Sequence, residues 1–175
     1  SIALKNLRSN KTKKSNQPYV LMLEEAFEKA TNRDLDRINF LKNEGNPSRL
    51  EEIYNLYVNL ENRQFQIQPL LPLPILDAGK NATFNFNNYT TDIINSKEKL
   101  STYLYSKAKN VLANSVNKYD FRNAYSDLNY LNKINPNYSD VLNLMEEAHF
   151  KGTDFVNVVM KNRSNKVIPI RLERD

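Results

Sequence analysis

The sequence predicts an all-α fold made of stacked antiparallel helical hairpins with a minor β element. Apolar side chains recur every three or four residues through most of the chain, which puts them on one face of successive helices. The 175 residues include three glycines, and each stands at a predicted turn or helix end. A mean hydropathy of -0.67 favours the thin core of stacked hairpins over one large core.

The N-terminal third predicts helices separated by polar breaks. Apolar spacing over 2–7 indicates a first helix, which ends before the basic run at 11–14. Pro18 suits the first turn of a second helix. That helix either bends at Thr31, whose side chain could cap a new start, or runs straight to a stop at Gly45.

A proline-rich segment then interrupts the helical pattern. A third helix is predicted from Pro47 through Leu60. Three prolines within 68–76 exclude a helix interior or a central strand there, so we expect an extended segment with its leucines buried across the helices. A turn should follow at 77–80, and alternating apolar and polar residues at 83–87 predict a short strand.

The C-terminal half predicts three more helices and a hairpin. The helices are expected at about 91–117, 121–134 and 138–152. Strand-like residues then predict a β-hairpin over 153–175, either the start of a second domain or an edge of the first. Because both β segments need a partner, we expect this one to pair with 83–87.

The helix at 121–134 has the most informative spacing. It carries a small residue, two large ones and a terminating proline: Ala124, Leu128, Leu131 and Pro136. The small residue would let two helices approach closely, and the large ones would fill the adjacent space. This pattern resembles the second helix of a tetratricopeptide repeat, with Tyr105 and Ser139 opening two successive repeats. The resemblance is best over 104–152, within a helical repeat-like domain of 1–152.

A wider order of segments also has a counterpart. It comprises 23–27, 33–38, 68–73, the tetratricopeptide-like pair and 167–169. This order resembles the N-terminal part of uncharacterised cell-envelope lipoproteins of Gram-negative bacteria. The resemblance implies a place in the cell envelope, and contact with the membrane only through a lipid anchor upstream of Ser1. It implies no activity.

The residue inventory contains no catalytic constellation. The absence of cysteine excludes disulfides, thiolate metal sites and a thiol nucleophile. His149 is the single histidine of the sequence, and a helix-packing role is a simpler interpretation than a base or a metal ligand. Adjacent acids such as Glu146 and Glu147 point in different directions on a helix. We therefore expect no catalytic residue, metal or cofactor in this chain.

The densest basic patch comprises Lys5, Arg8 and the run at 11–14. No aromatic residue is interleaved with these cations to stack on a base, so a solvated loop is favoured over nucleic-acid binding. Contact with a phosphate or an anionic lipid stays open.

The sequence favours a non-enzymatic scaffold that binds a protein or peptide through its repeat surface. In tetratricopeptide folds the first helices of the repeats line the groove, and on this alignment its residues would be Lys109, Asn143, Glu147 and Phe150. The tyrosines of the repeat region, which could also line a groove, are expected to be mostly part of the core. The alternative is a helical presenting domain of a larger enzyme whose catalytic part lies beyond residue 175.

Overall fold

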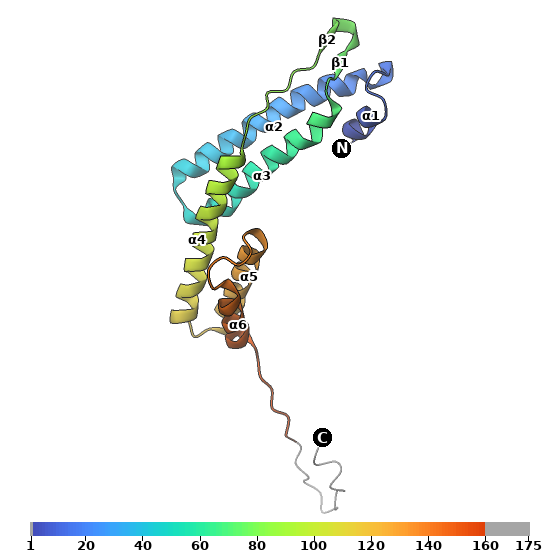
Figure 1. The fold of residues 1–175 in the computed structure, drawn as a ribbon. Coiled ribbons are helices and arrows are strands. Elements are labelled where there is room, and N and C mark those ends of the chain that lie inside the picture. The colour runs from blue at the N-terminus through green and yellow to red at the C-terminus, as the bar shows by residue number, and fades with distance from the viewer. Residues whose placement is uncertain (1, 160–175) are drawn as a thin grey trace, which may run out of the picture.

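The computed structural model describes residues 2–159, where six α-helices form two arms that meet at an elbow (Figure 1). The proximal arm comprises α1 (Ile2–Ser9), α2 (Gln17–Glu44), α3 (Leu50–Ile67) and the connection 68–89. The distal arm comprises α4 (Thr90–Asn114), α5 (Lys118–Ile134) and α6 (Val141–Gly152). The predicted, predominantly helical class with a minor β element is confirmed.

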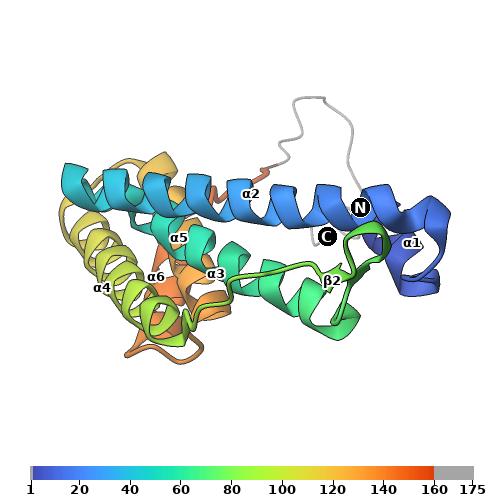
Figure 2. The ribbon, with the colours of Figure 1, turned by 90° about the horizontal axis from the view of Figure 1, so that it is seen from above.

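Of the two predictions for Thr31, a bend or a continuous helix, the structure shows the continuous helix α2. The helix runs without a bend from Gln17 to Glu44, and Thr31 is buried inside it. Gly45 ends it as predicted, with a left-handed φ of 65° and its N–H bonded to the Leu41 carbonyl. A 3₁₀ turn at Pro47–Arg49 then leads into α3, which returns antiparallel beside α2 (Figure 2).

A buried carboxylate links the two long helices of the proximal arm. Asp34 of α2 is 4% exposed. It accepts hydrogen bonds from Arg63 of α3 and from the neighbouring Arg33, and Arg63 also donates to Thr31 at 3.4 Å. This polar link fixes the register of α2 against α3, because a buried charge is tolerated only when it is paired.

The proline-rich segment packs over the helices as predicted, but it begins as a 3₁₀ turn at Gln68–Leu70 that continues α3, and not as an extended chain. Leu70 and Leu73 are buried against Leu7 and Val20, which come from α1 and the start of α2. Leu76 departs from the expectation, since it is 42% exposed. The predicted turn is the tip of a small antiparallel hairpin that joins β1 (Pro74–Ile75) to β2 (Lys80–Asn81).

The strand predicted at 83–87 is wrong. This segment runs along α2 and α3 as an extended strap without a strand partner (Figures 1 and 2). Its alternating rings pack on a helix instead of a sheet: Phe84 and Phe86 lie 5.4 and 5.7 Å from the ring of Phe27. The side chain of Gln64 pairs with the backbone of Asn87 in both directions, at 2.8 and 2.7 Å, as a neighbouring strand would.

The distal arm follows the sequence pattern more closely. Ala124, Leu128 and Leu131 are all buried in one core formed by α4, α5 and α6. Helix α4 ends a few residues earlier than predicted, because Asn117 caps α5 by accepting a hydrogen bond from the N–H of Tyr119 at 2.9 Å.

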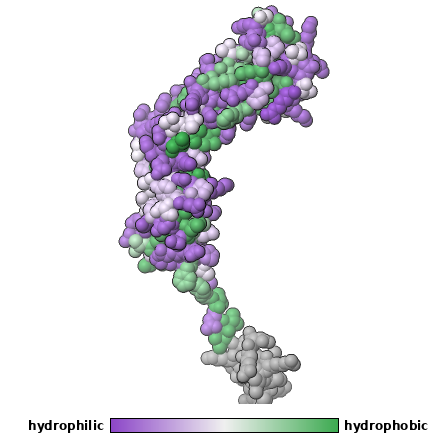
Figure 3. Space-filling model, viewed as in Figure 1, coloured by the Kyte–Doolittle hydropathy of each residue, from purple (hydrophilic) through white to green (hydrophobic). Residues whose placement is uncertain are grey.

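Residues 153–159 form no strand, so the described part of the predicted C-terminal hairpin is not β structure. They leave α6 as an exposed apolar extension, which is largely green in Figure 3 and includes Phe155 and Val156. The expected pairing with 83–87 is wrong for these residues, since the two segments lie in different arms (Figure 1). The remaining part of the predicted hairpin, 160–175, lies outside the described residues.

Candidate functional site

The four residues predicted to line a peptide groove are all exposed. They are Lys109 on α4 and Asn143, Glu147 and Phe150 on α6. The three on α6 share one helix face, because they are spaced four and three residues apart. Glu147 forms an ion pair with Lys151 at 2.6 Å, and the ring of Phe150 lies 5.5 Å from that of Phe155.

The seam between α4 and α6, on which Lys109 lies, is closed by hydrogen bonds within the chain. Tyr105 donates to Asp140 at 2.6 Å, and Lys109 donates to the Tyr105 hydroxyl at 3.3 Å. These bonds lower the pKa of the Asp140 carboxyl and raise that of the Lys109 ammonium group. At the other end, Lys151 donates to the Leu112 carbonyl at 2.9 Å. Lys109 therefore already has a partner in the chain.

The other chemistry-bearing residues of the distal arm lie on its surface. His149 is exposed and packs against the ring of Tyr125 at 5.7 Å, so it contributes to a surface contact and not to the core. The tyrosines of this region are mostly half-buried, as predicted, although Tyr119 is 70% exposed. Within residues 2–159, no cluster of three or more His, Cys, Asp or Glu side chains has a geometry that could hold a metal ion.

A cavity of about 330 Å³ lies at the elbow, where α2 ends and α4 begins. The α2–α3 turn and helices α2, α3 and α4 supply its lining. The lining residues are Leu41, Lys42, Gly45, Asn46, Pro47, Leu50, Ile53, Tyr57, Asp92, Asn95, Ser96 and Lys99. We call this space the elbow cavity. Its floor is apolar, because Leu41, Ile53 and Tyr57 are buried side chains of the core.

The rim of the elbow cavity carries more positive than negative charge. Lys42 donates to the Tyr57 hydroxyl at 2.6 Å and stands 5.0 Å from the centre of that ring. Its distance to the Asp92 carboxylate is 3.9 Å, in a half-exposed pair that stabilises the fold little. Lys99 has no hydrogen-bond or ionic partner among the described residues. One ammonium group is therefore available to a ligand.

Local structure explains how the cavity is held open. The left-handed Gly45 reverses the chain, and Asn46 accepts a hydrogen bond from the N–H of Ser48 at 3.0 Å. On the opposite wall, the buried Ser96 hydroxyl bonds to the Asp92 carbonyl of its own helix at 2.7 Å. Since the turn and the helix wall satisfy their own polar groups, a ligand would not need to break either.

The elbow cavity was not predicted from the sequence. The stop at Gly45 and the restart at Pro47 do predict an antiparallel turn, and such a turn brings Lys42 towards Tyr57. The approach of α4, which carries Lys99, depends on packing between segments far apart in the chain. No local motif records that packing.

Helices that could cross a membrane are absent from the part of the chain that the structure describes. No protein-family model matches the sequence, and comparisons with curated proteins and with solved structures give no match either.

Proposed function

We propose that this chain is a non-enzymatic interaction module, and that the elbow cavity binds a protein segment carrying a large apolar side chain next to an acidic group. The observation that carries this proposal is the combination of an apolar floor with a cationic rim at the junction of three helices. Apolar pockets with a few oriented polar groups are the usual form of a ligand site.

Each part of the cavity has a counterpart in such a ligand. Leu41, Ile53 and the ring of Tyr57 can cover an aliphatic or aromatic side chain. The ammonium group of Lys99 can donate to a carboxylate, and Asn95 can bond to the backbone of the bound segment. Asp92 opposes a second negative charge close to Lys42, which favours ligands with a single acidic group.

The predicted groove on α4 and α6 is a weaker candidate for the same role. Its cation, Lys109, is hydrogen-bonded to Tyr105, and Glu147 is paired with Lys151. A ligand carboxylate at this face would compete with these contacts, whereas Lys99 at the elbow is free of them among the described residues. The elbow cavity is therefore our preferred site.

Selection from a displayed peptide library against the immobilised full chain tests the proposal. We expect selected peptides to share an acidic residue beside a large apolar one. Lys99→Gln should weaken their binding about tenfold, since a hydrogen bond to a charged group contributes about 1.5 kcal/mol. The matched control is Lys97→Gln, which removes the same charge two residues earlier on α4 and outside the cavity lining, and should leave binding unchanged. Peptides that bind both variants equally would exclude the elbow cavity.

We further propose that the module belongs to the bacterial cell envelope and that its helices stack as in tetratricopeptide repeats. The support is the order of sequence segments described above, together with the sequential packing of α4, α5 and α6 around one core. Fractionation of cells expressing the natural full-length gene tests the location. Recovery of the protein only from the cytoplasmic fraction would contradict it.

A further inference from the structure

The net charge of the chain is concentrated in its first segment. Residues 1–23 contain five cationic side chains and no acidic one, while the chain as a whole carries a formal net charge of +5. The other 20 cations are therefore matched in number by the 20 acidic residues that follow. These five cations are Lys5, Arg8, Lys11, Lys13 and Lys14.

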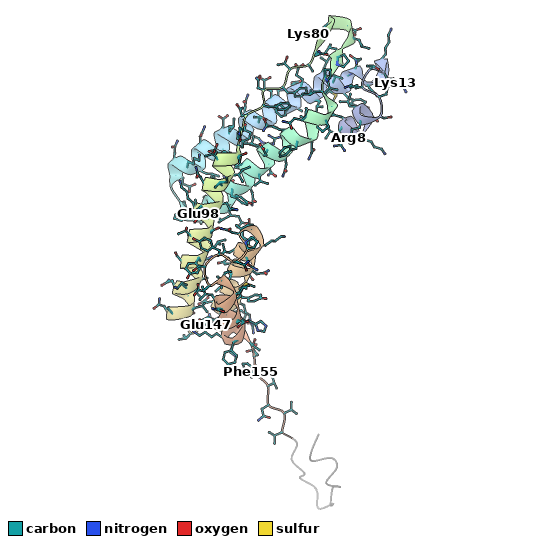
Figure 4. All side chains as sticks on the ribbon, viewed as in Figure 1. Arg8, Lys13, Lys80, Glu98, Glu147 and Phe155 are labelled. Carbon is teal, nitrogen blue, oxygen red and sulfur yellow. The ribbon has the colours of Figure 1, made fainter. Side chains whose placement is uncertain are left out.

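The fold gathers this charge at the free end of the proximal arm, far from the elbow. Figure 4 shows Arg8 and Lys13 at this end, with Lys80 at the tip of the β1–β2 hairpin beside them. Lys80 and the exposed Asp77 of the same hairpin offset each other, so residues 2–23 and 74–81 keep the excess of the first segment. We call this region, comprising residues 2–23 and 74–81, the basic end. The acids that follow, Glu24 and Glu25, are engaged by the Thr83 N–H and by Lys29.

Almost none of this charge is used to hold the fold together. Lys11 donates to the Leu70 carbonyl at 3.1 Å and so anchors the proline-rich segment. Lys5, Arg8, Lys13 and Lys14 are exposed and form no ion pair with any described carboxylate. Arg8 stands in the last turn of α1, where a cation stabilises the helix. The other three cations have no such structural role in the described part of the chain.

Exposed aliphatic side chains accompany the cations. Leu21 and Met22, in the early turns of α2, are 50% and 60% exposed, and Leu76 of the hairpin is 42% exposed. The Leu76 N–H bonds to the side chain of Gln17 at 2.9 Å, one helical turn before Leu21. This bond places Leu76 on the side of α2 that carries Gln17 and Leu21, whereas Met22 points to a neighbouring side of the helix. The cation Lys14 lies in the 3₁₀ turn that directly precedes Gln17. Figure 3 shows green atoms among purple ones at this end.

We propose that the basic end binds the surface of an anionic lipid bilayer. Its lysine and arginine side chains would contact the headgroups, and the three aliphatic side chains would enter the interface. Nucleic acid is the weaker alternative. Single-stranded nucleic acid stacks its bases on exposed rings, whereas Tyr19, the aromatic residue of this segment, packs against the core. A duplex would contact the cations through its phosphates and would leave the exposed aliphatic side chains unused. This proposal is independent of the elbow cavity, so either can fail without the other.

Flotation of the full chain with lipid vesicles tests whether the cations of the basic end bind anionic lipid. We expect binding to vesicles that mix phosphatidylglycerol with phosphatidylcholine, no binding to phosphatidylcholine alone, and release at high salt. Lys13→Gln with Lys14→Gln should weaken binding roughly 25-fold, at about fivefold for each cation. The control pair, Lys97→Gln with Lys133→Gln, lowers the net charge equally on the other arm. It should bind as the unchanged chain does.

A fluorescence reporter tests which end of the proximal arm contacts the bilayer. The sequence contains no tryptophan, so one introduced indole reports a single position. Met22→Trp should shift its emission to the blue on adding anionic vesicles. Phe40→Trp, near the opposite end of α2 and equally exposed at 60%, should not shift.

Three results would overturn the proposal. One is the absence of binding to anionic vesicles at low salt. A second is equal weakening by the two charge pairs, since that would assign binding to net charge and not to the basic end. The third is tight binding to single-stranded or duplex DNA by a chain that ignores vesicles, which would assign the patch to nucleic acid.

Discussion

The two arms bury their apolar residues in different ways. In the distal arm, three helices that follow one another in sequence share one core, in which Leu128 and Leu131 are fully buried. In the proximal arm, α1 and the start of α2 contact Leu70 and Leu73 directly, although most of α2 and all of α3 separate these segments in the sequence. A separate core joins α2 to α3. The distal core is thus built mainly from neighbours in sequence, with Leu50 and Tyr54 of α3 packed against it, whereas the proximal arm joins distant segments.

The arms also differ in their buried polar contacts, and the charged one lies in the proximal arm. The buried Asp34 and its partner Arg63 fix α2 against α3, and the side chain of Gln64 holds the strap at Asn87. In the distal arm the contact of Tyr105 with Asp140 lies at the surface. The buried Ser101 hydroxyl of this arm accepts a hydrogen bond from Asn135 at 3.1 Å without any buried charge. We therefore expect apolar changes to act most strongly in the distal arm, and polar changes in the proximal arm.

The largest effect should come from the two cores. Leu128→Ala removes a fully buried side chain from the core shared by three helices and should lower the free energy of unfolding by about 3 to 4 kcal/mol. Leu73→Ala removes an equally buried side chain from the proline-rich segment itself, and this segment can shift to fill part of the space. We expect about 2 kcal/mol there. Denaturant unfolding measures both.

Amide hydrogen exchange separates the two variants further. Leu128→Ala should raise exchange throughout α4, α5 and α6, whereas Leu73→Ala should raise it mainly over 70–82. Leu142→Ala, at a half-exposed position of α6, is the control and should change little. Equal, global loss of protection in both core variants would contradict the distinction between the arms.

The second effect concerns the buried carboxylate. Asp34→Asn keeps the shape of the side chain but leaves the Arg63 guanidinium without a counter-charge between α2 and α3. The expected loss is about 2 kcal/mol, the size of a hydrogen bond to a charged group. Thermal unfolding measures it.

Asp36→Asn provides the matched control for this change. Asp36 is exposed two residues further along α2, so its replacement should change stability by less than about 0.5 kcal/mol. Similar losses in the two variants would show that the Asp34 link does not hold the arm together.

The same contrast explains what the sequence could predict. The spacing of Ala124 and Leu128 predicts the distal helices, because helix periodicity records a contact between neighbours. The alternation at 83–87 predicts a strand, yet Phe84 and Phe86 meet a helix, and periodicity does not say what covers an apolar face. The elbow cavity escaped prediction for the same reason, since Lys99 reaches it only when α4 packs against α3.

The smallest effect is a dependence on pH at the end of the distal arm. Lys118 and Arg122 of α5 donate to Asp154 at 2.7 and 2.6 Å, and these hydrogen bonds lower the pKa of the Asp154 carboxyl below its ordinary value of 3.8. Because the folded pKa is the lower one, the stabilisation is complete above the ordinary value and is lost as the pH falls through the folded pKa.

We therefore expect the thermal midpoint to fall slightly on acidification below that value, with the last turn of α6 losing exchange protection first. Asp154→Asn should flatten part of this dependence, whereas Asp36→Asn should leave it unchanged. The contribution must be small, because the Asp154 side chain is 62% exposed and water screens the pair. If acid instead opened α2 and α3 before the last turn of α6, the Asp154 contacts would not be the first to be lost and this prediction would be wrong.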